Sequence, residues 1–152
     1  KVRLVDSNFE SNRALDTFGG AVSVEGASRL SVSRCVFAYN HATEGGAVYG
    51  SDSGTTVFLQ YCSLKGNIAK QNGGAMMADT LNSIAVESCY FDGNYAGDLG
   101  GGIQCYESTL EATNCTFDRN KVQGDGGAIG LSYATSATVT KCHFIENRGV
   151  EV

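Results

Sequence analysis

The sequence contains no proline and no tryptophan, and it has few basic residues. Its 11 lysines and arginines stand against 16 aspartates and glutamates, which gives a net charge of -5. No basic run alternates with aromatic residues, so we expect no nucleic-acid partner. The longest apolar runs have only four or five residues, far too few to cross a bilayer, so we expect no membrane span within this segment.

What is present is sufficient for a folded core. Hydrophobic residues make up 42% of the chain, and seven phenylalanines and seven tyrosines supply bulky side chains, which argues against disorder. A length of 152 residues predicts one domain. The chain begins with Lys1 and shows no signal region, so we expect it to be part of a longer protein.

A repeated motif organises the whole chain. Its first half places an aromatic residue, or a leucine in one copy, three residues before an asparagine. Successive asparagines are separated by 28, 27, 27, 26 and 27 residues. The six pairs are Phe9 and Asn12, Phe37 and Asn40, Leu64 and Asn67, Phe91 and Asn94, Phe117 and Asn120, and Phe144 and Asn147.

The second half of the motif is a glycine pair followed by a small residue and an aliphatic one. It occurs five times at the same period. The pairs are Gly19 and Gly20, Gly45 and Gly46, Gly73 and Gly74, Gly100 and Gly101, and Gly126 and Gly127.

Apolar residues alternate by two over short runs, with breaks between the runs, as in Leu30 and Val32 followed by Cys35 and Phe37. A period of two indicates strands, and the breaks predict three short strands per repeat. A repeat of about 27 residues cannot bury its own inward face, so successive repeats must stack strand on strand. We therefore predict one all-β domain, a parallel β-helix (solenoid) of about six coils of about 27 residues, covering 1–25, 26–52, 53–79, 80–106, 107–134 and 135–152, within a longer array.

Stacking gives each column of the repeat a physical role. The phenylalanines form an internal aromatic stack, and the asparagine amides donate to one neighbouring coil and accept from the other. The glycine pairs suit a corner that needs a positive φ and a close approach of the backbone.

Five of the six cysteines occupy one inward column, while Cys105 belongs to a different strand. We interpret the column as small buried hydrophobes, and we leave its redox state open because five thiols cannot pair completely. The two histidines, His41 and His143, are isolated, and no CxxC motif occurs, so we expect no metal and no cofactor. The column comprises Cys35, Cys62, Cys89, Cys115 and Cys142.

The pattern FxxNxA followed by GGA and an aliphatic residue, as in Phe37 to Ala42 and Gly45 to Val48, resembles the repeats of chlamydial polymorphic outer membrane proteins. Similar repeats are found in surface proteins of algae and protists. The resemblance covers residues 2–149, with departures at Leu64, Gly102 and Met76. It implies a right-handed β-helix that forms the passenger region of a surface autotransporter and acts in adhesion.

Acidic residues precede the glycine pairs, namely Asp16, Glu44, Asp98 and Asp125, with Asn72 in the remaining copy. Stacked carboxylates there offer a catalytic pair for a polysaccharide lyase or hydrolase, or a calcium site. The alternative is a solvated turn in which Asp and Asn are good turn formers. No Lys, Arg or His shares this column, so we assign no catalytic residue and expect no enzyme activity.

Three residues at outward positions form a predicted contact surface, namely Tyr49, Met77 and Tyr90. Asn114, Cys115 and Thr116 match a glycosylation sequon, a hint of secretion. The preferred function is a non-catalytic module outside the cell or at its surface, a rigid spacer or adhesion segment whose partner is a surface protein, a glycan or a neighbouring copy. The alternatives are a structural component of an extracellular filament and a carbohydrate-active enzyme on the same fold.

Overall fold

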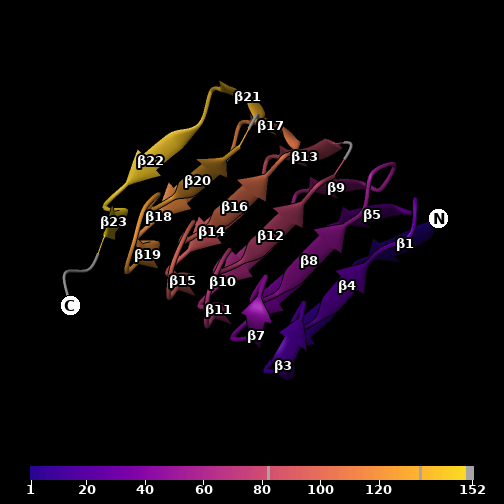
Figure 1. The fold of residues 1–152 in the computed structure, drawn as a ribbon, viewed down its shortest axis with the longest axis horizontal. Helices are drawn as coiled ribbons and strands as arrows, with labels where there is room; N and C mark the ends of the chain where they lie inside the picture. The colour runs from indigo at the N-terminus through magenta and orange to yellow at the C-terminus, as the bar shows by residue number, and fades with distance from the viewer. Residues whose placement is uncertain (82, 134, 150–152) are drawn as a thin grey trace.

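A computed structural model describes residues 1–81, 83–133 and 135–149, which form short strands joined by turns and bends (Figure 1). All strand pairs in this part of the chain are parallel, and each joins residues about one repeat apart. The fold is a parallel β-helix with five full coils and, in the described residues, part of a sixth, which confirms the predicted fold class.

Each full coil contributes one strand to each of four sheets, so the prediction of three strands per coil was wrong. The strand that follows each asparagine has only two residues in four of the six coils, for example Ile68–Ala69. Two residues cannot display an alternation, so the periodicity of the sequence did not reveal this strand.

The first two sheets, called A and B here, have six strands each. Sheet A contains β1 (Val2–Val5), β5 (Arg29–Ser33), β9 (Thr56–Gln60), β13 (Ser83–Glu87), β17 (Thr109–Thr113) and β21 (Ser136–Thr140). Sheet B contains β2 (Asn8–Glu10), β6 (Val36–Ala38), β10 (Ser63–Lys65), β14 (Tyr90–Asp92), β18 (Thr116–Asp118) and β22 (His143–Ile145).

Sheet C follows the asparagines, and sheet D follows the glycine pairs. Sheet C contains β3 (Arg13–Phe18), β7 (His41–Glu44), β11 (Ile68–Ala69), β15 (Tyr95–Ala96), β19 (Lys121–Val122) and β23 (Arg148–Gly149). Sheet D contains β4 (Val22–Val24), β8 (Val48–Ser51), β12 (Met76–Asp79), β16 (Ile103–Tyr106) and β20 (Ile129–Ser132).

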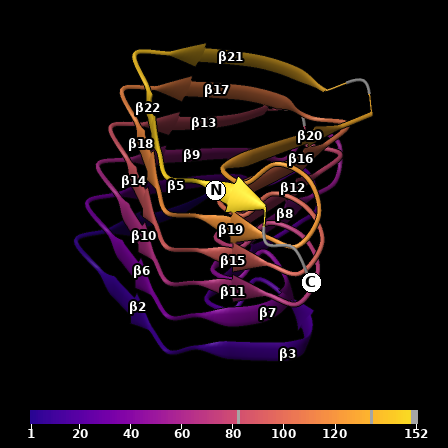
Figure 2. The same cartoon turned by 90° about the vertical axis from the view of Figure 1, so that its left-hand side faces the viewer.

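Sheet D runs through the middle of each coil, between sheet A and sheet C (Figure 2). The first three residues of β8, β12 and β16 are all buried, whereas β9 and β13 alternate between buried and half-buried residues. Sheet D is therefore covered on both faces, and sheets A, D and C form successive layers.

A column of aromatic rings lies on the inner face of sheet B. The rings of Phe91 and Phe117 lie 4.7 Å apart and within 6° of parallel, and Phe144 continues the stack at 5.1 Å. Leu64 occupies the same column one coil before Phe91 and is completely buried. The column supplies three of the largest fully buried side chains in the described residues, namely Phe37, Phe91 and Phe117.

A ladder of asparagine side chains joins the coils at the corner between sheets B and C. The Nδ2 of Asn94 donates to Oδ1 of Asn120 and to the carbonyl of Leu64, both at 2.9 Å. Its own Oδ1 accepts from the backbone N–H and from Nδ2 of Asn67, both at 3.0 Å. The same pattern recurs along the stack, and Asn40, Asn67, Asn94 and Asn120 are completely buried.

The glycine pair performs two separate tasks at the reversal between sheets C and D. The first glycine of each pair has a positive φ, for example +66° at Gly73. The second lies against the next coil, so that a Cβ on Gly74 would overlap the carbonyl oxygen of Gly101. Each coil can therefore stack on the next only because this position has no side chain.

Candidate functional site

The predicted contact surface is wrong for two of its three residues. Tyr49 and Met77 are each only 5% exposed, because they lie in sheet D between two other layers. The ring of Tyr49 stacks on Phe18 of β3 with 4.5 Å between centroids, and its hydroxyl donates to Asp79 at 3.3 Å. Burial raises the pKa of Tyr49, and the nearby Asp79 carboxylate adds to that effect. These residues stabilise the layers and are not available to a partner.

Tyr90 lies elsewhere, on the outer face of sheet B, and is 37% exposed. Its hydroxyl donates to Asp118 at 2.9 Å, and this hydrogen bond raises the pKa of the tyrosine above its usual value. The structure therefore does not bring the three residues together.

The acidic residues before the glycine pairs do not form one column. The carbonyl of Asp98 accepts a hydrogen bond from the N–H of Gly124 in the next coil. Asp125 is one residue further along the chain and lies in the column of Leu99. The reason is that the two acids occupy different positions in the repeat, because Asp98 stands two residues before its glycine pair and Asp125 only one residue before its own. Asp98 and Asp125 are therefore not stacked as the predicted catalytic pair requires.

The remaining members of this group have contacts of their own. Asp16 forms an exposed ion pair with Lys70 at 3.4 Å, and Asn72 donates to Glu44 at 2.8 Å. Phe18, and not Asp16, stands beside Glu44 in the register of β3 and β7. Among residues 1–81, 83–133 and 135–149, no three His, Cys, Asp or Glu side chains lie close enough to hold a metal ion.

All six cysteines are free thiols, and five of them are buried. In the column, the backbone N–H of one cysteine donates to the sulfur of the next, as from Cys62 to Cys89 at 3.4 Å. Hydrogen bonds with neighbouring thiols, together with burial, raise the pKa of Cys89, and burial alone raises the pKa of Cys105 to about 12. The hydrogen bond with Cys89 lowers the pKa of Cys62 and of Cys115, but these thiols are buried as well. Burial keeps reagents away from all of them, and their role is to fill the core.

We predict that one thiol of the native chain reacts rapidly with a disulfide reagent. Cys142, in the last described coil, is half-buried, while the other five are buried. Burial raises the pKa of Cys142 above its usual value of 9.0, so its reaction rate should still be increasing at pH 9. Counting fast-reacting thiols by absorbance, with and without denaturant, checks this prediction. A Cys142→Ser variant should lose the fast phase, and several fast thiols in the native protein would contradict the buried column.

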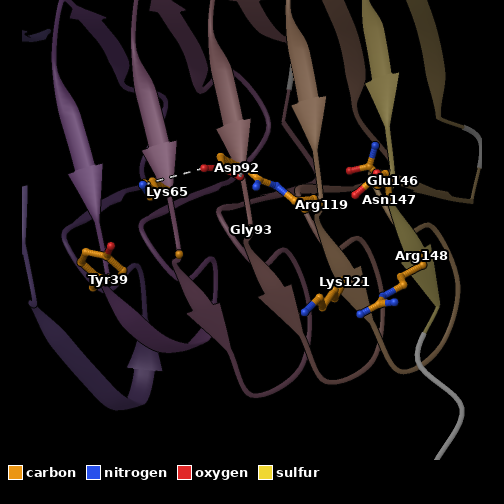
Figure 3. Close-up of a pocket in the computed structure, with 10 residues that line it drawn as sticks. Tyr39, Lys65, Asp92, Gly93, Arg119, Lys121, Glu146, Asn147 and Arg148 are labelled. Carbon is orange, nitrogen blue, oxygen red and sulfur yellow. Dashed lines mark hydrogen bonds and ion pairs between the residues drawn. The ribbon is translucent and has the colours of Figure 1, made fainter.

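A hollow in the surface lies beside the asparagine ladder and is called the corner notch here. It has a volume of about 670 Å³ and is bounded by Tyr39 at one end and by Arg119, Lys121 and Arg148 at the other (Figure 3). Its members belong to sheets B and C and to the turn between them.

The corner notch exists because two side chains are missing from one column. The residue before each ladder asparagine has a positive φ in all six coils. In two successive coils this residue is glycine, and a Cβ on Gly93 would have no neighbour within 4 Å. At Gly66 the ring of Tyr39 covers the backbone, 2.8 Å from where a Cβ would stand. The column comprises Ser11, Tyr39, Gly66, Gly93, Arg119 and Glu146.

An ion-pair network forms one side of the corner notch. Asp92, only 7% exposed, accepts from Arg119 at 2.8 Å and lies 4.0 Å from the Nζ of Lys65. Arg119 also pairs with Asp118 at 3.1 Å. The hydrogen bond to Asp92 raises the pKa of Arg119, so the guanidinium group stays charged.

Two further cations of the corner notch stand outside that network. Lys121 of β19 and Arg148 of β23 are register partners on adjacent strands. Neither forms an ion pair within the part of the chain that the structure describes. Like charges on directly adjacent strands destabilise each other, so this position favours an anion.

Sequence reasoning missed the corner notch, although part of its signal is readable. The residue before the ladder asparagine is glycine in two successive copies of the repeat, Gly66 and Gly93. Lys65 belongs to a strand of sheet B and Arg119 to a turn two coils later, and only the structure shows that both reach Asp92.

The fold and its ladders define a parallel β-solenoid built from stacked, nearly identical coils. The chain belongs to the right-handed β-helix family, because the family model described as "Right handed beta helix region" matches residues 7–152. This match also confirms the predicted handedness. No curated protein and no solved structure matches the chain. No helix among the described residues is long and apolar enough to cross a membrane.

Proposed function

We propose that this chain is a non-catalytic β-helix module that acts as a rigid spacer and adhesion segment at a cell surface. The observation that carries the proposal is the continuity of its columns, because every coil is joined to the next by backbone ladders, buried asparagines and packed side chains. Such a stack resists bending, since each coil is tied to its neighbours on every side.

The surface location is supported by the resemblance of the repeats to those of polymorphic outer membrane proteins. It is supported further by the position of Asn114, the sequon asparagine, which is exposed at a corner while Cys115 is buried. A glycosyltransferase needs access of this kind.

Labelling of intact cells tests the location. An antibody raised against the 152-residue chain should label unpermeabilised cells of the source organism, and brief external protease treatment should remove the label. Labelling that requires permeabilisation would overturn the surface assignment.

The absence of catalysis is tested separately. The purified chain should release no reducing ends and no unsaturated sugars from acidic or neutral polysaccharides during prolonged incubation. If turnover is found and Asp98→Asn or Asp125→Asn abolishes it, the protein is a carbohydrate-active enzyme instead.

A further inference from the structure

The corner notch has two different anchors at its two ends. At one end stands Tyr39, which is 55% exposed and belongs to the second coil. At the other end stand Lys121 and Arg148, in the fifth and sixth coils. Between them lies a glycine floor, where the ring of Tyr39 covers the backbone of Gly66 and the backbone of Gly93 is bare (Figure 3).

We propose that the corner notch binds an acidic oligosaccharide, with sugar rings against Tyr39 and along the glycine floor and a carboxylate or sulfate group held by Lys121 and Arg148. The proposal rests on the adhesive part of the function proposed above and names the class of ligand that it would engage.

The length of the corner notch requires an extended ligand. Neighbouring strands in a sheet are about 4.8 Å apart, so the three coil steps from Tyr39 to Lys121 cover roughly 14 Å and the four steps to Arg148 roughly 19 Å. A single ring or a free carboxylate cannot contact both ends. A linear chain of about three or four sugar units, lying along the axis of the β-helix, can do so.

The floor favours a glycan over a peptide. An extended peptide binds a sheet through alternating main-chain hydrogen bonds. Here the N–H of Gly66 already donates to the carbonyl of Asp92 at 2.8 Å, and that of Gly93 donates to Asp118 at 2.9 Å. What the corner notch offers is an aromatic ring, a smooth floor and charged side chains at its rim, which suits rings with hydroxyl and acidic groups.

The charge distribution favours an acidic ligand. Asp92 and Asp118 are matched by Arg119 and Lys65, so these four side chains leave no net charge. Lys121 and Arg148 contribute two further positive charges, against the single carboxylate of Glu146. The corner notch is therefore locally positive on a chain whose net charge is -5. Because these cations are partly exposed, binding should weaken as salt increases.

The test is a titration of the 152-residue chain with defined tetrasaccharides. The probes are a galacturonate tetrasaccharide, a sulfated heparin-derived tetrasaccharide and neutral cellotetraose. We expect saturable binding of at least one acidic probe, at least tenfold tighter than binding of cellotetraose. The two acidic arms distinguish a carboxylate-bearing ligand from a sulfate-bearing one.

A blocking variant locates the site. Gly93→Tyr places a ring in the open part of the corner notch, and Tyr39 shows that this column accepts tyrosine at a φ of +55°. Gly26→Tyr is the matched control, because Gly26 also has a positive φ, +71°, and open space around its Cβ, but lies in a turn outside the corner notch. We expect Gly93→Tyr to raise the Kd at least tenfold and Gly26→Tyr to leave it unchanged.

A charge variant tests the anionic end. The double substitution Lys121→Gln and Arg148→Gln should raise the Kd for the acidic probe about tenfold and remove most of its salt dependence. The matched control replaces two exposed cations elsewhere, Arg3→Gln and Lys141→Gln, which lowers the net charge equally and should have little effect.

The proposal fails if neither acidic probe binds saturably, if Gly93→Tyr binds as well as Gly26→Tyr, or if both charge variants weaken binding equally. An acidic peptide that binds better than either glycan and is lost in Gly93→Tyr would assign the corner notch to a protein partner and would also overturn the proposal. Surface labelling is independent of these results, so the loss of this proposal is distinguishable from the loss of the surface function.

Discussion

The Gly74→Ala variant is expected to lose at least about 3 kcal/mol of folding free energy, or to fail to fold as a stack. A Cβ at this position would overlap the carbonyl oxygen of Gly101 and come within 2.7 Å of the carbonyl carbon of Tyr95. Both atoms are backbone of the next coil, so no side-chain rotation can relieve the overlap. The two coils would have to separate, which breaks the ladder bond from the N–H of Gly74 to the carbonyl of Gly100 at 3.0 Å.

Gly93→Ala is the matched control for this variant. Gly93 has a φ of +60°, but a Cβ there meets nothing within 4 Å. Its replacement by alanine should lower the folding free energy by only about 1 kcal/mol, because a residue other than glycine must then adopt the left-handed conformation. Unfolding in urea, followed by circular dichroism for both variants and the parent chain, measures the difference. Equal losses in the two variants would show that the close approach of the coils at Gly74 is not a strong constraint.

The period of the repeat made the architecture predictable, because a stack places each residue type on its own equivalent. Phenylalanines at intervals of about 27 residues can all be buried only if the coils align, and the same holds for asparagines whose amides pair in one direction. The family match confirms the β-helix, and the observed register places Phe91 beside Phe117, as the repeat requires.

The layering of the coil was not predictable in the same way. If each coil were a simple prism of three strands, an outward-pointing residue such as Tyr49 would be exposed. The predicted contact surface depends on that shape. The glycine pair reverses the chain so that sheet D returns through the middle of the coil, and the outward position then faces Phe18 of β3. The cause lies in the path of the whole coil, which no local pattern encodes.

The candidate site was hidden for a different reason. Its defining feature is the lack of side chains at Gly66 and Gly93, and a search for chemically active residue types passes over glycine. The ion pairs that Asp92 forms with Arg119 and Lys65 join three successive coils. They depend on the reach of side chains between sheet B and the turn that follows it, a property of the folded coils and not of residue spacing.

The Asn94→Ala variant is expected to lose about 3 to 4 kcal/mol, a large part of the stability of a typical domain. Asn94 is completely buried and makes four hydrogen bonds through its amide group. Alanine leaves the backbone N–H of Asn67 and the carbonyl of Leu64 without these partners in the interior. Each such buried group costs about 1 to 3 kcal/mol, and the lost side chain also leaves a cavity.

Two controls separate the ladder from general effects of truncation. Asn8→Ala removes an exposed asparagine whose side-chain hydrogen bond to Glu10 is long, at 3.5 Å. Asp98→Ala removes an exposed side chain from the same coil as Asn94. Both should change the free energy of unfolding by less than about 0.5 kcal/mol.

Urea unfolding of the three variants measures these differences. Asn94→Ala should lose more unfolding free energy than the two controls only if the ladder stabilises the stack. If Asn94→Ala matches Asn8→Ala, the coils are held by their backbone ladders and core alone. The amide column would then set the register of the coils without contributing to their stability, and we would expect Asn67→Ala and Asn120→Ala to be equally mild.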